Sequence, residues 1–194
     1  MPNFKKDWMQ KADIDYFSPF ISLWLAFNSW YRDHYCDLTD KRDRSFINNL
    51  KTDTTTRNQP LNNLKKLMAD EKIKENLKFK SDLESLIYSL NRASLRMLEN
   101  QKHPRQIKFE SALIDYSKKD IDDGYTNLIK AKGDREKLLL DELFITNDLD
   151  IFFAGLIEII YQIRCLLIHG DLEPSKENHE VVKYCYFILA SLIA

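Results

Sequence analysis

The feature that most constrains this fold is an apolar stretch of about twenty residues whose large side chains recur at helical spacing. Asp148 precedes the stretch in the position of a helix N-cap, and Gly170 follows it in the position just past a helix C-terminus. The pattern therefore predicts a helix over 149–169. Three charged residues interrupt its hydrophobicity, which indicates the core helix of a bundle rather than a membrane span. They are Asp150, Glu158 and Arg164.

The same periodicity marks helices near both ends and in the middle of the chain. It predicts core helices over about 19–35, 81–98 and 175–194, and a shorter helix that follows Pro60. Ser18, which a proline follows, is the expected N-cap of the first of them. With only 4 glycines in 194 residues, the composition favours helices over turn-rich sheet. We therefore expect an all-α bundle whose core is built from long N- and C-terminal helices.

The stretch 101–133 has no sustained period, apart from residues 106–109, which alternate like a short strand. We expect loops and short helices there, as an irregular central helical insertion in the bundle. No repeat, low-complexity tract or glycine-rich linker divides the chain. The sequence therefore predicts a single domain over 1–194.

No pattern for a bound cofactor or metal is present. There is no glycine-rich phosphate loop, and the four histidines and three cysteines lack the spacing of zinc ligands. We expect neither a cofactor nor a metal, which disfavours NTPases and zinc hydrolases. The few scattered cysteines and the lack of an apolar N-terminal leader favour a cytoplasmic protein. Residues 51–110 hold 13 Lys or Arg against 8 Asp or Glu, which suits either phosphate contacts or an ordinary solvated helix face.

Two residues that could carry chemistry stand at the end of the apolar helix. Arg164 and His169 are five positions apart, a spacing that advances about 7.5 Å along a helix and turns about 140° beyond a full revolution. Their side chains can converge only if the helix ends at the histidine, and Gly170 supplies that ending. A guanidinium that grips a phosphate beside an imidazole that exchanges a proton suits transfer at a phosphodiester.

Such a site needs no metal if the nucleophile belongs to the substrate. RNA carries a 2′-hydroxyl beside each phosphate, so we expect attack by that hydroxyl and a 2′,3′-cyclic phosphate product, with DNA left intact. A structural alternative stays open. Arg164 could form an ion pair with Glu158 or Asp171, and His169 could simply cap the helix.

The string IYQIRCLLIHGDLEP, which contains both residues, resembles the HEPN superfamily, whose signature is R-x4-6-H at the end of a bundle helix. The segment FSPFISLWLAFNSWYR is similar to the start of several bacterial HEPN families, including the Apea-like group, and VVKYCYFILASLI also fits. The likeness covers roughly the first and last quarters of the chain. It implies a HEPN-like helical domain that forms a homodimer and cuts single-stranded RNA in a composite cleft.

Carried over to this chain, the resemblance gives Arg164 the role of holding the scissile phosphate and His169 a role in acid-base chemistry. Asn28 is a supporting candidate that would face the cleft, or else an asparagine bonded to backbone. Cys165 stands where many active members have Asn, Asp or His, and Asp171 stands where toxins paired with nucleotidyltransferase antitoxins have tyrosine. Because many members act as toxins or in defence, an antitoxin or regulatory protein is a further expected partner.

Three functions fit these residues. The first is a metal-independent endoribonuclease that works as a homodimer. The second is a non-catalytic module of the same fold whose basic segment 51–110 binds RNA or another protein. The third is a purely structural helical dimer in which Arg164 and His169 stabilise the interface.

Overall fold

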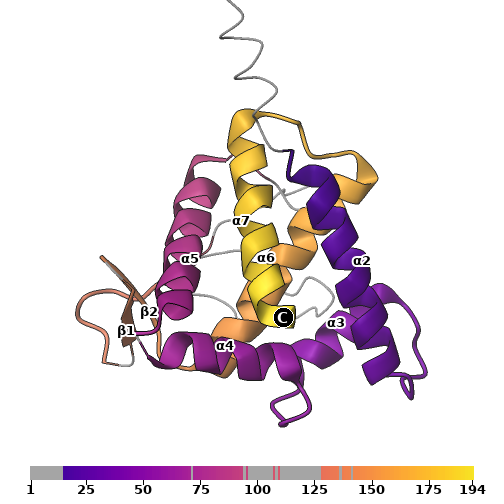
Figure 1. The fold of residues 1–194 in the computed structure, drawn as a ribbon, viewed down its shortest axis with the longest axis horizontal. Coiled ribbons are helices and arrows are strands. Elements are labelled where there is room, and N and C mark those ends of the chain that lie inside the picture. The colour runs from indigo at the N-terminus through magenta and orange to yellow at the C-terminus, as the bar shows by residue number, and fades with distance from the viewer. Residues whose placement is uncertain are drawn as a thin grey trace, which may run out of the picture.

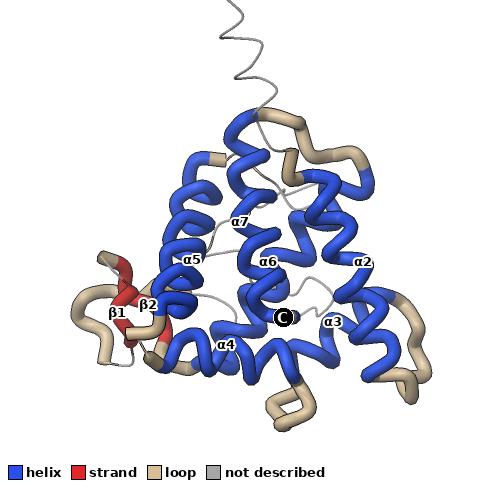
Figure 2. The backbone as a smooth tube through the Cα atoms, in the orientation of Figure 1, coloured by secondary structure: helices blue, strands red, loops and turns tan. Residues whose placement is uncertain are grey.

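The described part of the chain is a helical bundle with one small β-hairpin at its edge (Figures 1 and 2). The computed structural model describes residues 15–70, 72–93, 95, 107, 109, 128–135, 137–140 and 142–194. Its helices there are α2 (Phe17–His34), α3 (Asp43–Thr52), α4 (Gln59–Ala69), α5 (Lys74–Arg92), α6 (Leu149–His169) and α7 (Lys176–Ile193). The hairpin strands are β1 (Lys137–Leu140) and β2 (Leu143–Thr146). The predicted helical architecture is therefore confirmed.

Helices α6 and α7 form the centre of the bundle. In Figure 1, α7 (yellow) lies between α5 and α2, and it packs against both of them and against α4. Helix α6 packs mainly against α3. Every residue of α6 from 152 to 163 is buried, which explains why its sequence is apolar on all sides. By length and composition α6 could also span a membrane, but 72% of its most apolar window is buried in the protein, as in a core helix.

The ends of α6 and α7 follow from local chemistry that the sequence already contains. The Asp148 carboxylate accepts hydrogen bonds from the backbone N–H groups of Asp150 and Ile151, at 3.0 and 3.1 Å. Gly170 adopts a left-handed conformation with φ 76° and ends the helix. The Ser175 hydroxyl caps α7 by accepting from the Asn178 N–H at 3.2 Å. The predicted Asp148 N-cap and the predicted Gly170 ending are confirmed, and the structure adds Ser175 as the N-cap of α7.

The start of α2 differs from the prediction, because Ser18 is not its N-cap. The helix begins at Phe17, and its N-cap residue Tyr16 makes no side-chain cap hydrogen bond. Asp15 takes that role instead, since its carboxylate accepts from the Phe17 N–H at 3.0 Å. The Ser18 hydroxyl donates to the same carboxylate at 3.5 Å.

Helix α5 is also shifted relative to the predicted 81–98. It begins at Lys74, seven residues early, because the buried Phe79 extends the apolar face and the buried Asn76 amide donates to the Lys66 and Asp70 carbonyls, at 3.0 and 2.9 Å. It ends at Arg92, since Ala93 has an extended backbone with ψ 137°. Leu95 is not helical either. Residues 96–98 lie outside the described part of the chain.

Two elements were not expected. Helix α3 has only Phe46, Ile47 and Leu50 as buried apolar residues, and its Asn, Ser and Thr are weak helix formers, so its sequence gives little signal. The hairpin pairs Lys137 with Thr146 and continues to the turn between the strands. Most of the predicted central insertion 101–133, including Gln106 and Lys108 of the expected strand, lies outside the described residues.

Candidate functional site

Arg164 lies within the contact between α6 and α3, with 18% of its side chain exposed. A terminal nitrogen of its guanidinium is 3.1 Å from Oδ2 of Asp43, the first residue of α3. The guanidinium carbon also lies 5.5 Å from the ring centre of Trp24 on α2. The expected ion pairing of Arg164 is therefore present, but its partner is neither Glu158 nor Asp171. The partner comes from the helix that periodicity did not reveal.

The other carboxylate oxygen of Asp43 collects three donors from α2. It accepts from Asn28 Nδ2 at 2.8 Å, from the Tyr31 hydroxyl at 2.9 Å and from the Arg32 guanidinium at 3.0 Å. Arg32 Nε also donates to Asn28 Oδ1 at 2.9 Å. We call these residues, together with Arg164, the Asp43 cluster. Asn28 and Arg164 are thus brought to one carboxylate, and Asn28 is bonded to side chains rather than to backbone.

Sequence reasoning missed Asp43, Tyr31 and Arg32. A signal for the last two was present, because Tyr31 and Arg32 stand three and four residues after Asn28 and share its helix face. Burial, with the nearby Asp43 carboxylate, raises the pKa of Tyr31 well above its usual value of 10.0. The Tyr31 hydroxyl is therefore held protonated, as a donor to Asp43.

His169 occupies a different environment. It is the last residue of α6 and is exposed, while Arg164 one and a half turns earlier contacts α2 and α3. Within the described part of the chain, the His169 side chain makes no hydrogen bond or ion pair with any residue. The predicted helix ending at His169 is confirmed, but one copy of the chain does not bring His169 into the Asp43 cluster.

A second buried network surrounds Glu158, which is 1% exposed. Both of its carboxylate oxygens accept from Arg44 at 2.7 Å, Lys51 Nζ donates at 2.7 Å, and Gln162 Nε2 donates at 2.8 Å. Burial acts to raise the pKa of Glu158, but the adjacent Lys51 and Arg44 charges outweigh it and lower the pKa. Glu158 is therefore ionised and holds two cations.

Tyr161 joins the two networks. Its ring centre lies 4.5 Å from the guanidinium carbon of Arg44 and 6.0 Å from that of Arg164. Among the described residues, the joined region brings together the cationic side chains of Arg32, Arg44, Lys51 and Arg164 and the carboxylates of Asp43 and Glu158.

Cys165, beside Arg164, is not activated. Its Sγ lies 3.9 Å from an Arg164 terminal nitrogen. Burial raises the pKa of the Cys165 thiol, although its contacts with Arg164 and Tyr161 act in the other direction. The thiol is therefore a protonated neighbour of the guanidinium rather than a nucleophile.

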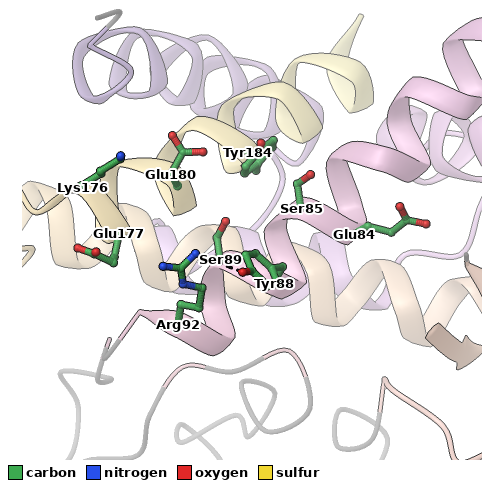
Figure 3. A pocket seen from close by; sticks show the side chains of 9 residues that line it. All are labelled: Glu84, Ser85, Tyr88, Ser89, Arg92, Lys176, Glu177, Glu180 and Tyr184. Atoms are coloured by element: carbon green, nitrogen blue, oxygen red, sulfur yellow. Dashed lines mark hydrogen bonds between the residues drawn. The ribbon is translucent and has the colours of Figure 1, made fainter. Parts of the chain in front are cut away.

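A separate cavity of about 540 Å³ lies between α5 and α7 (Figure 3). Its charged lining consists of Glu84, Glu177 and Glu180 against Arg92 and Lys176. Three carboxylates against two cations do not favour a polyanion such as RNA. None of the predicted site residues lines this cavity, so it is not the expected cleft.

Comparison with known proteins adds no relative. No protein-family model, curated protein or solved structure matches this chain. Within the described residues, no group of three or more His, Cys, Asp or Glu side chains is placed to hold a metal ion. What the protein does is therefore inferred from its own residues and their geometry.

Proposed function

We propose that this protein is a metal-independent endoribonuclease of the HEPN type that acts as a homodimer on single-stranded RNA. The observation that carries the proposal is that one helix, α6, presents both required groups. Arg164 forms an ion pair with Asp43 and is 18% exposed, and His169 is exposed at the end of the same helix.

The proposed reaction uses the substrate's own hydroxyl as the nucleophile. The 2′-oxygen forms a bond to the adjacent phosphorus, and the bond from phosphorus to the 5′-oxygen breaks. His169 of one copy accepts the 2′-hydroxyl proton, and the protonated His169 imidazole of the other copy donates a proton to the departing 5′-oxygen. The products are a 2′,3′-cyclic phosphate and a free 5′-hydroxyl.

Arg164 would hold the scissile phosphate and stabilise the charge that develops on its oxygens. Asp43 supports that role because an arginine fixed by a carboxylate loses less side-chain entropy when it binds a phosphate. A second copy is part of the proposal because Arg164 and His169 face different surroundings in one chain. Two helix ends meeting across a two-fold axis would supply an arginine and a histidine to the same phosphate.

The test is cleavage of a fluorescent single-stranded RNA in EDTA, with DNA of the same sequence as the negative control. Arg164→Ala and His169→Ala are each expected to lower the cleavage rate by about 100-fold or more. Arg135→Ala, at an exposed loop position before β1 and outside the basic segment 51–110, is the matched control and should leave the rate unchanged. Circular dichroism checks that each variant is folded. Wild-type activity retained in either α6 variant would refute the assigned roles.

A binding module without catalysis is the second candidate. The close contact between Arg164 and Asp43 favours it, because a carboxylate already neutralises part of the arginine's charge. This candidate predicts salt-sensitive RNA binding with no cleavage products. A purely structural dimer predicts instead that the two α6 variants lose dimerisation in sedimentation velocity, with no RNA affinity in the wild type.

A further inference from the structure

Asp43 contacts two arginines from different helices. Arg32 on α2 lies 3.0 Å from its Oδ1, and Arg164 on α6 lies 3.1 Å from its Oδ2. One carboxylate balances only one of the two positive charges. The side chains of Arg32 and Arg164 are 41% and 18% exposed, so the remaining charge is accessible from solvent.

The two guanidinium groups also retain donors for a ligand. A guanidinium has five N–H donors. Among the described residues, one Arg164 terminal nitrogen contacts Asp43 and the other lies 3.9 Å from the Cys165 Sγ, so each terminal nitrogen keeps a further N–H. Arg32 donates one N–H to Asn28, one to Asp43 and one to the Lys41 carbonyl at 3.3 Å. One N–H group therefore remains on each of its two terminal nitrogens.

We propose that Arg32 is a second phosphate-binding residue of this site, acting beside Arg164 on the backbone of single-stranded RNA. A phosphodiester fits because its two non-bridging oxygens match the fork of a guanidinium, and a single-stranded backbone supplies phosphates in series. The RNA ligand rests on the proposed function. The inference itself concerns binding, which can be measured without cleavage.

The experiment measures binding of a 2′-O-methyl RNA oligonucleotide by fluorescence anisotropy over a range of salt concentrations. This probe cannot be cleaved, because its 2′-oxygen is blocked. Arg32→Gln removes the charge and the guanidinium fork, together with the contact of the guanidinium carbon 5.0 Å from the centre of the Phe46 ring. It should weaken binding by about tenfold and reduce the slope of log affinity against log salt by about 0.7, the value for one lost phosphate contact.

Arg42→Gln is the matched control. Arg42 is also paired with a carboxylate, Asp40, at 2.6 Å, but its side chain is 83% exposed and its guanidinium bonds to Asp40 rather than to the adjacent Asp43. It should leave both the affinity and the salt slope unchanged. A loss of the same size in Arg42→Gln would mean that any arginine here contributes, which would overturn the specific role of Arg32.

The outcomes separate this inference from the proposed enzyme. If wild type cleaves RNA and Arg32→Gln binds the probe as tightly as wild type, the inference is overturned and the enzyme stands. If binding depends on Arg32 but the wild type cuts no RNA, the role of Arg32 is supported and the proposed endoribonuclease activity is refuted. If wild type does not bind the probe, both are overturned. Arg32→Lys, which keeps one charge without the fork, should recover part of the affinity and checks that folding is not the cause.

Discussion

The Arg164 guanidinium and the Asp43 carboxylate lie 3.1 Å apart across the contact between α6 and α3, and each side chain is only 18% exposed. Water screens a pair at this depth less than it screens a surface pair. Asp43 also accepts from Asn28, Tyr31 and Arg32. The pair therefore ties α2, α3 and α6 together at the proposed site.

Asp43→Asn should lower the free energy of unfolding by about 1–3 kcal/mol, because Arg164 would then be partly buried without a countercharge. In an Arg164→Gln background, Asp43→Asn should lower the free energy of unfolding by less, because the Arg164 charge is already absent. Urea denaturation of the four proteins in this double-mutant cycle measures the coupling. Asp40→Asn, which breaks the exposed pair with Arg42, is the control and should have a smaller effect. Equal costs in both backgrounds would show that the two charges do not interact.

Glu158→Gln should destabilise the protein by about 3 kcal/mol at neutral pH, because Lys51 and Arg44 lose the carboxylate that they share. The folded-state pKa of Glu158 is lowered from its usual 4.5, so its contribution is fully present above about pH 4.5 and is lost as the pH falls toward the folded pKa. The stability gap between wild type and Glu158→Gln should therefore narrow on acidification. Denaturation at several pH values measures it.

The exposed Glu142 provides the control for that experiment. The difference in unfolding free energy between wild type and Glu142→Gln should be small at every pH. If the difference in unfolding free energy between wild type and Glu158→Gln stays constant below pH 4.5, the conclusion that Glu158 is ionised would be contradicted. A constant difference would mean that the cost comes from altered packing rather than from the lost charge.

Gly170→Ala should destabilise the protein by about 1 kcal/mol through backbone conformation alone. Gly170 has φ 76°, and an added Cβ would meet no atom within 4 Å. Gly170→Asn should cost less, because asparagine tolerates the left-handed region. Gly133 has equal space for a Cβ without the left-handed φ, so Gly133→Ala is the control and should be close to neutral. Thermal unfolding compares the three variants, and a neutral Gly170→Ala would reject the conformational cost.

The sequence predicted those parts of the fold whose signals are local. Helix α6 was placed over its full length because its period, the Asp148 cap and the Gly170 ending all lie within one stretch of chain. Helix α3 was missed because three buried apolar residues among weak helix formers carry no clear period. Its stability depends on packing against α6, which no local pattern records.

The candidate site shows the same division. The angle of about 140° between Arg164 and His169 around the helix follows from their spacing, but the convergence that the ending at Gly170 was expected to allow is not found within one copy of the chain. The partner of Arg164 does not follow in this way, because Asp43 is distant in sequence and belongs to a helix without a local signal. Glu158, by contrast, was recognised as a charge inside a core helix, but Arg44 and Lys51, which neutralise it, come from that same unpredicted helix.

Native protein should show one rapidly reacting thiol with Ellman's reagent near pH 8, and three after unfolding. Cys36 is exposed, whereas Cys185 is fully buried and its burial raises the thiol pKa. Burial also raises the pKa of Cys165, so its thiolate fraction should be low despite the nearby Arg164. Cys36→Ser should abolish the rapid phase. A rapid phase that persists in Cys36→Ser and disappears only with Cys165→Ser would mean that the Arg164 charge outweighs burial, and Cys165 would then be a nucleophile inside the proposed site.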